Sequence, residues 1–78
     1  MSDEPLEIAP EITVDRRVRF GKPVVKGTRV PITTVLGQLA AGASYYEISR
    51  EYGITEHQIR AVIGYAATVI SQETIRAR

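Results

Sequence analysis

The stretch SYYEISREYGITEHQIRAVI, residues 44–63, decides the fold of this chain. Its apolar residues have helical spacing on both sides of Gly53, which suits a tight turn because glycine takes a positive φ at no steric cost. Each of the two segments starts with a capping box, formed by Ser44 with Glu47 and by Thr55 with Gln58. The pattern predicts a helix-turn-helix. In the DNA-binding version of this motif, the second helix lies in the major groove.

A further helix is predicted directly before this motif. Its apolar residues share one helical face: Ile32, Val35, Leu36, Leu39 and Ala40. Pro31 suits the first turn of this helix, where its missing N–H costs nothing, and Gly42 suits the position just after the last turn. The last helix of the set begins at Thr55 and reaches about Ile70.

Short strands are predicted ahead of the helices. Residues 12–14 alternate apolar and polar side chains, and Val18 and Phe20 extend the alternation. Residues 24–25, between a proline and a glycine, indicate a second short strand or an extended turn. The predicted fold class is therefore mainly α: a small N-terminal β segment of one or two short strands, followed by a three-helix, homeodomain-like helix-turn-helix domain.

The chain divides into three predicted parts. Residues 1–11 read as a flexible acidic tail, because they contain two prolines and no periodicity. Residues 12–70 form the single domain, which joins the β segment to the helix-turn-helix. Residues 71–78 are polar and basic, and we expect them to fray. The late turns of the last helix, from Tyr65 to Ile70, either form a dimer surface or cover the β segment of the same chain.

The net charge of +1 hides a strong asymmetry along the chain. Residues 1–15 carry five acids and no base, whereas residues 16–29, the basic segment, carry six bases and no acid. A basic segment in a small domain suggests a polyanion or an acidic partner. The alternative is a solvated strand and loop whose bases meet the acidic tail.

If the last helix reads DNA, its early exposed positions make the contacts. Arg60 suits a guanine edge, and Gln58 suits an adenine edge unless its side chain serves the capping box. The full set of candidate base and phosphate contacts on this helix is Thr55, His57, Gln58, Arg60 and Ala61. The candidate phosphate contacts of the basic segment are Arg16, Arg17, Arg19, Lys22 and Lys26. Glu47, Glu51 and Glu56 oppose this reading, because they would repel phosphate.

Catalysis and metal binding have little support in the sequence. There is no cysteine, and His57 is the only histidine, so neither a nucleophile with its base nor a metal-ligand cluster is indicated. We predict that the protein is not an enzyme and needs no metal or cofactor. The acidic start lacks the positive region of a secretory signal, and no apolar run approaches the ~20 residues of a membrane span. A cytoplasmic protein without a membrane partner is expected.

Residues 21–65 resemble domain-of-unknown-function family 433. The most specific part is GKPVVKGTRVP, residues 21–31, whose signature positions are Gly21, Lys22, Pro23, Gly27, Thr28, Arg29 and Pro31. The likeness continues through an A-A-G helix end, an S-x-x-E-I helix start and a Y-A pair in the last helix. One departure is the tight turn at Gly53, where many relatives have a longer turn with a proline.

The resemblance implies a helix-turn-helix antitoxin similar to the VapB type. Such a protein binds and silences a PIN-like nuclease toxin and represses the shared operon. It implies turn roles for Gly21 and Gly27 and an anchoring or contact role for Arg29. We expect a homodimer that binds double-stranded DNA, and charge alone suggests residues 1–11 as the toxin contact. The alternatives are a protein-interaction module that uses the helix-turn-helix only as a scaffold, and a stand-alone transcriptional regulator.

Overall fold

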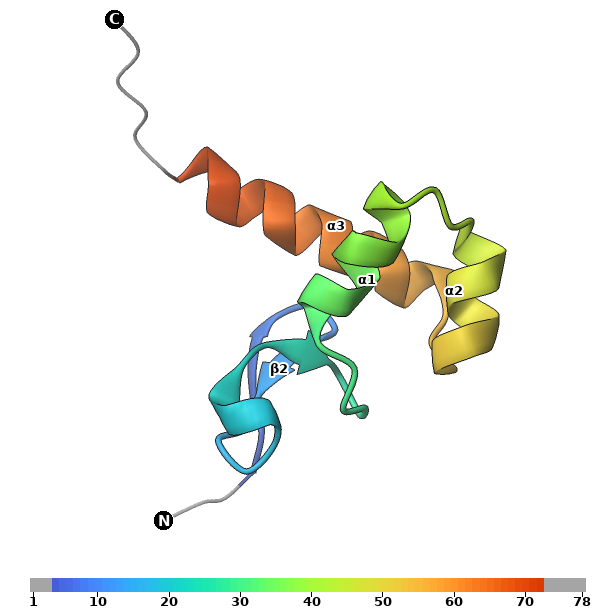
Figure 1. Cartoon of the computed structure of the whole chain (residues 1–78). Helices are drawn as coiled ribbons and strands as arrows, with labels where there is room; N and C mark the ends of the chain where they lie inside the picture. Colours follow the sequence, from blue (N-terminus) through green and yellow to red (C-terminus); the bar gives the residue numbers. More distant parts are fainter. Residues whose placement is uncertain (1–3, 73–78) are drawn as a thin grey trace, which may run out of the picture.

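A computed structural model of the protein describes residues 4–72, in which a small sheet precedes three helices (Figure 1). The elements in chain order are β1 (Leu6–Ala9), β2 (Ile12–Val14), the short 3-10 turn η1 (Arg19–Gly21), β3 (Val24–Val25), α1 (Ile32–Ala40), α2 (Tyr45–Tyr52) and α3 (Glu56–Ser71). This confirms the predicted mainly helical class with an N-terminal β segment. The sheet has three strands, one more than the sequence predicts.

The additional strand is β1, and it corrects the prediction of a flexible tail over residues 1–11. β1 pairs antiparallel with β2, and β2 pairs antiparallel with β3, so β1 is an edge strand. A bulge between Glu7 and Ala9 re-aims β1 before the turn at residues 10–11. The folded unit therefore begins at Leu6, whereas residues 1–3 and 73–78 lie outside the described residues.

The three helices confirm the predicted boundaries. Ser44 and Thr55 are the N-caps of α2 and α3, and both capping boxes are complete in both directions. Gly53 ends α2 in the left-handed region, with a φ of 67°. Gly42 follows the end of α1 with a φ of 97°. These are the positions where backbone geometry excludes most other residues.

The core lies where the sheet meets the three helices. It is aliphatic, as the scarcity of aromatic residues predicts, and its members are Ile12, Val25, Ile32, Val35, Ile48, Ile54, Ile59 and Val62. Because α3 contributes only its first two turns to this core, its C-terminal half projects past α1 (Figure 1).

The sequence left two roles open for the projecting half of α3, a dimer surface or a cover for the β segment, and the structure decides between them only in part. Tyr65 packs against the core, and its ring borders a groove shared with residues 8–10 at the end of β1. The chain thus covers one side of the helix. Ile63 and Ile70 do not line this groove and remain exposed, so their side of the helix has no cover among the described residues.

Candidate nucleic-acid interface

The first turn of α3 is held by Gln58, which the sequence places among the base-reading residues. Gln58 Oε1 accepts a hydrogen bond from the Thr55 backbone N–H at 3.0 Å, and the Thr55 hydroxyl accepts one from the Gln58 N–H. Gln58 Nε2 donates to Glu11 Oε1, also at 3.0 Å, so the side chain joins α3 to the β1–β2 turn. Both ends of the amide are engaged, and we therefore remove Gln58 from the candidate base contacts.

Ala61 is also placed differently from the sequence prediction. It is half-buried and lines the groove beside Ile8 and Tyr65, which is the sheet-facing side of α3. Of the predicted contacts at the start of α3, Thr55, His57 and Arg60 remain exposed, as does the acidic Glu56. These three define the reading face, and Glu56 lies among them.

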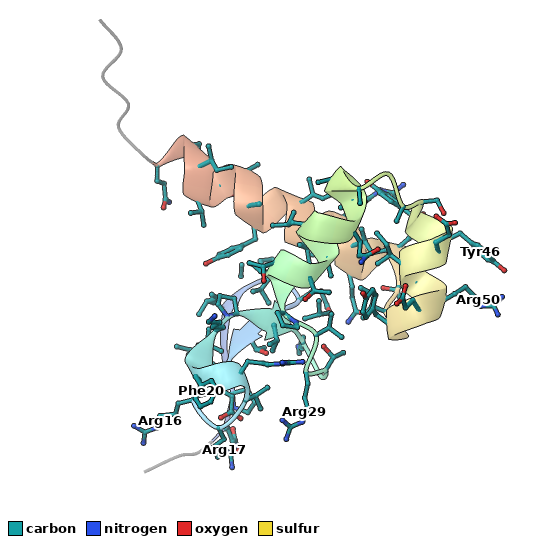
Figure 2. All side chains as sticks on the ribbon, viewed as in Figure 1. Arg16, Arg17, Phe20, Arg29, Tyr46 and Arg50 are labelled. Carbon is teal, nitrogen blue, oxygen red and sulfur yellow. The ribbon has the colours of Figure 1, made fainter. Side chains whose placement is uncertain are left out.

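The arginine of the reading face is held by its neighbours. Arg60 Nη1 lies 3.5 Å from Glu56 Oε1, and the guanidinium stacks over the Tyr45 ring at 5.4 Å from its centroid. On α2, Arg50 makes a similar stack over Tyr46 at 5.6 Å and donates to its hydroxyl at 2.8 Å (Figure 2). An exposed pair such as Arg60–Glu56 contributes little stability. Its formal charges cancel, so the pair offers no net positive charge to phosphate at this face.

Two bases of the basic segment are neutralised within the chain. Arg17 holds Asp15 through two side-chain bonds, from Nε at 3.1 Å and from Nη2 at 2.9 Å. Lys26 Nζ donates to Glu7 Oε1 at 3.1 Å. The bond from Arg17 lowers the pKa of Asp15, and the bond from Lys26 lowers the pKa of Glu7. The Lys26–Glu7 pair fits the alternative in which bases of the segment meet the acidic tail, whereas Arg17 pairs with Asp15, which lies beyond residues 1–11.

The other bases of the segment have no acidic partner within residues 4–72. Arg19 Nε donates to the backbone carbonyl of Arg29 at 3.2 Å, which leaves its charge uncompensated. Arg16, Lys22 and Arg29 are exposed and form no ion pair within the part of the chain that the structure describes. Figure 2 shows Arg16, Arg17 and Arg29 at the sheet end, away from Tyr46 and Arg50 on α2. Four cations outside the ion pairs therefore gather on and beside residues 15–22, which we call the basic loop, and the charge of Arg29 also acts on Asp15, whose pKa it helps to lower.

Phe20 at the tip of the basic loop was missed by the sequence analysis. The alternation places it in a strand, but it lies in η1 with a φ of 57° and is 96% exposed. Its only sequence signal is its setting, because it is the single aromatic residue in RRVRFGK, residues 16–22. Val18 would share its face in a strand, so the alternation alone does not distinguish this loop from a strand.

The signature GKPVVKGTRVP forms the connection from the basic loop to α1. Gly21 and Gly27 have φ values of 81° and 77°, which agrees with turn roles for both. The Thr28 hydroxyl donates to the Val25 carbonyl at 2.7 Å and accepts from the Val30 N–H at 3.0 Å. These bonds close the turn that carries Arg29 to the exposed end of the basic loop.

The sequence profile described as "Protein of unknown function (DUF433)" matches residues 12–66. The chain belongs to this family. The match runs from β2 through most of α3, so it covers the core, the signature and the helix-turn-helix. β1 lies before the matched residues.

Two proteins of Mycobacterium tuberculosis are similar to this chain. A protein of strain H37Rv named "Putative antitoxin VapB45" is 39% identical over 49 residues, which are 63% of this chain and 20% of that protein. The crystal structure of Rv2018 has a TM-score of 0.63 at 36% identity and matches 67% of this chain and 24% of the solved one. The chain thus spans about a fifth to a quarter of these relatives. Among residues 4–72, no helix has the length and apolar character needed to cross a bilayer.

Proposed function

We propose that the protein is a VapB-type antitoxin that binds DNA as a homodimer, represses its own operon and neutralises a PIN-like nuclease toxin in the cytoplasm. The observation that carries the proposal is a fully capped helix-turn-helix in a family member that is 39% identical to a protein named as an antitoxin. The same residues supply no catalytic constellation, and the proposed role is binding alone.

The proposed DNA contacts follow from which side chains are available. The reading face supplies Thr55, His57 and Arg60, with Arg60 exchanging its bond to Glu56 for a base edge. Phosphates are held by the uncompensated cations Arg16, Arg19 and Lys22. Arg17 and Lys26 contribute less, because each already neutralises a carboxylate of its own chain. A weakly basic reading face needs such added phosphate contacts, since phosphate neutralisation supplies most of the affinity for DNA.

The proposed toxin contact stays within residues 1–11 but changes its character. Glu7 and Glu11 are engaged inside the chain, which weakens an argument from charge. β1 is an edge strand whose Leu6 and Ile8 are exposed. Exposed edges pair readily with a strand of another protein. We therefore assign the toxin contact to β1 as strand addition.

The proposed dimer surface is the projecting half of α3. Residues 61–72 contain no charged side chain, although much of this segment is exposed. A helix face that carries large apolar side chains and no charge is normally buried. Ile63 and Ile70, which lie outside the groove shared with β1, would be covered by the same helix of a second copy, in a two-fold symmetric contact.

The experiment that tests the DNA role compares the protein's own upstream DNA with a scrambled duplex at low and physiological salt. Sequence-dependent binding that survives physiological salt supports the repressor, and equal, salt-erased binding to both duplexes contradicts it. Arg60→Ala is expected to remove the sequence preference. Arg50→Ala is the matched control, because Arg50 is also an exposed arginine stacked on a tyrosine but lies on α2.

A second candidate function is a protein-interaction module that uses the helix-turn-helix as a scaffold. The Glu56–Arg60 pair and the nearby carboxylates of α2 favour it, because they lower the positive charge of the reading face. Copurification with a neighbouring nuclease in the absence of any DNA binding would support this candidate. An Ile8→Asp variant should then fail to copurify with the nuclease. If no nuclease gene lies beside the gene of this protein, a stand-alone regulator is favoured instead.

A further inference from the structure

Phe20 is the most exposed large apolar side chain of residues 4–72, at 96% exposure. Four of its six neighbours among residues 16–22 are charged: Arg16, Arg17, Arg19 and Lys22. Burial of a phenylalanine contributes ~1.5–3 kcal/mol to folding, and this chain forgoes that contribution. The position of Phe20 needs a reason other than packing.

The backbone holds Phe20 at the tip of the loop in an unfavourable conformation. Arg19 and Phe20 have φ values of 52° and 57°, followed by 81° at Gly21. Left-handed geometry costs ~1–2 kcal/mol for each residue with a Cβ. Such strain persists only where surrounding contacts impose it, and it is concentrated at binding sites.

The contacts that impose the conformation surround the tip on both sides. The Val18 N–H donates to the Asp15 carbonyl at 2.7 Å, and the Gly21 N–H donates to the Val18 carbonyl at 3.0 Å. Arg17 clamps Asp15 from the side, and the Arg19 side chain is tied to the Arg29 carbonyl. The aromatic ring is therefore presented on a preorganised loop, which reduces the entropy cost of binding.

The charges around Phe20 point to the chemistry of its ligand. Arg16, Arg19, Lys22 and Arg29 form no ion pair among residues 4–72, and only Arg29 is close enough to Asp15 to help lower the pKa of that carboxyl. One aromatic ring surrounded by cations matches a base with phosphates on either side of it. A protein partner would need a desolvated apolar centre instead, and every close sequence neighbour of Phe20 except Val18 and Gly21 is charged.

We propose that the basic loop is a nucleic-acid contact in which Phe20 stacks on a base while Arg16, Lys22 and Arg29 hold the flanking phosphates. The inference rests on the proposed DNA role and assigns it a second contact, separate from the reading face. On duplex DNA, Phe20 acts as a wedge between neighbouring base pairs, as apolar side chains do in minor-groove binding. A single strand offers the same base face without the need to unstack a pair.

The test uses the full chain with its upstream duplex, a scrambled duplex and the single strand, each carrying 2-aminopurine, whose fluorescence rises on unstacking. Phe20→Ala is expected to bind roughly tenfold or more weakly and to abolish the fluorescence change, with the salt dependence unaltered. Lys22→Gln should instead lower the slope of log affinity against log salt by roughly 0.9. Phe20→Trp should restore the affinity and the fluorescence change that Phe20→Ala loses. A fluorescence rise on the duplexes shows that Phe20 acts as a wedge between base pairs.

Tyr46→Ala is the matched control, because Tyr46 is also an exposed aromatic residue beside an arginine but lies on α2. Sequence-specific binding that Phe20→Ala leaves unchanged overturns the inference and leaves the repressor standing. Non-specific binding that Phe20→Ala weakens supports the inference and overturns the repressor. Absence of all binding overturns both. If Phe20→Ala loses only a protein partner, the basic loop is a protein contact and the inference is wrong.

Discussion

The helix-turn-helix of residues 44–63 and the basic loop of residues 15–22 differ in how they use their side chains. In the helix-turn-helix, both helices are capped, the turn residue is glycine, and Arg60 has an acidic partner. In the basic loop, two residues with side chains have left-handed backbones, an aromatic ring is exposed, and Arg16, Arg19 and Lys22 form no ion pair within residues 4–72. Local signals that all agree are typical of a scaffold, whereas local conflicts are typical of a binding site. The helix-turn-helix is therefore better explained as a folding scaffold. The basic loop is the stronger candidate for the contact that supplies affinity for nucleic acid.

The largest expected effect is the loss of stability when a core residue of the helix-turn-helix is truncated, compared with truncation at the exposed edge strand. Ile59 is fully buried at the start of α3, so Ile59→Ala should lower the free energy of unfolding by about 2–5 kcal/mol through the cavity that it leaves. Leu6→Ala, at an exposed position of the edge strand, should change it by less than about 0.5 kcal/mol. Urea denaturation of both variants gives the comparison. Equal losses would mean that β1 is part of the core.

A second test asks whether Gln58 serves the fold or the DNA. Glu47 and Gln58 have equivalent places in the two capping boxes, but only Gln58 also bonds Glu11. Gln58→Ala should therefore destabilise the protein by about 1 kcal/mol more than Glu47→Ala, the contribution of one hydrogen bond. Thermal or urea unfolding measures the difference. If the two variants are equally stable, the link to the β1–β2 turn does not form in solution.

A third test places glycine at a left-handed position of the basic loop, as the turn of the helix-turn-helix already has. Phe20→Gly removes the side chain from a left-handed position and should raise the free energy of unfolding by roughly 1 kcal/mol. The same variant should weaken nucleic-acid binding, so stability and function move in opposite directions. Chemical denaturation checks the first effect. A destabilised Phe20→Gly would show that the ring packs on the loop, contrary to its observed exposure.

The smallest expected effect is that of pH on the acidic partners of the basic segment. Hydrogen bonds from Lys26 and Arg17 lower the pKa values of Glu7 and Asp15 in the folded protein. The stabilisation is therefore present above the ordinary carboxyl pKa of about 4 and is lost as the pH falls through the lowered values. Glu7→Gln with Asp15→Asn should flatten the dependence of unfolding on pH below about 5. A decline of the same steepness in this variant would assign it to other carboxyl groups.

The success of the sequence analysis depended on how local each signal was. The capping boxes and Gly53 lie within a few residues of what they control, so the bounds of α2 and α3 followed directly. β1 was not predicted because it is defined by its pairing with β2. That pairing contains a bulge and leaves no regular alternation of apolar and polar residues in the sequence.

The misplaced site residues have a related cause. Gln58 and Ala61 were assigned to the reading face because the sequence indicates the period of α3, but it does not show which side of α3 meets the sheet. Phe20 fitted the apolar–polar alternation of a strand, but the turn closed by the Val18 N–H and the Asp15 carbonyl ends the strand before it. In each case the deciding contact joins residues that local sequence patterns do not connect.

The double use of Gln58 limits how the first turn of α3 can evolve. A substitution there opens the helix cap and releases the β1–β2 turn. Under the proposed DNA role, a change of operator preference therefore falls to His57 and Arg60, whose side chains are exposed and take no part in the cap. Copies of the gene that diverge in specificity are expected to differ at these two positions and to share the glutamine.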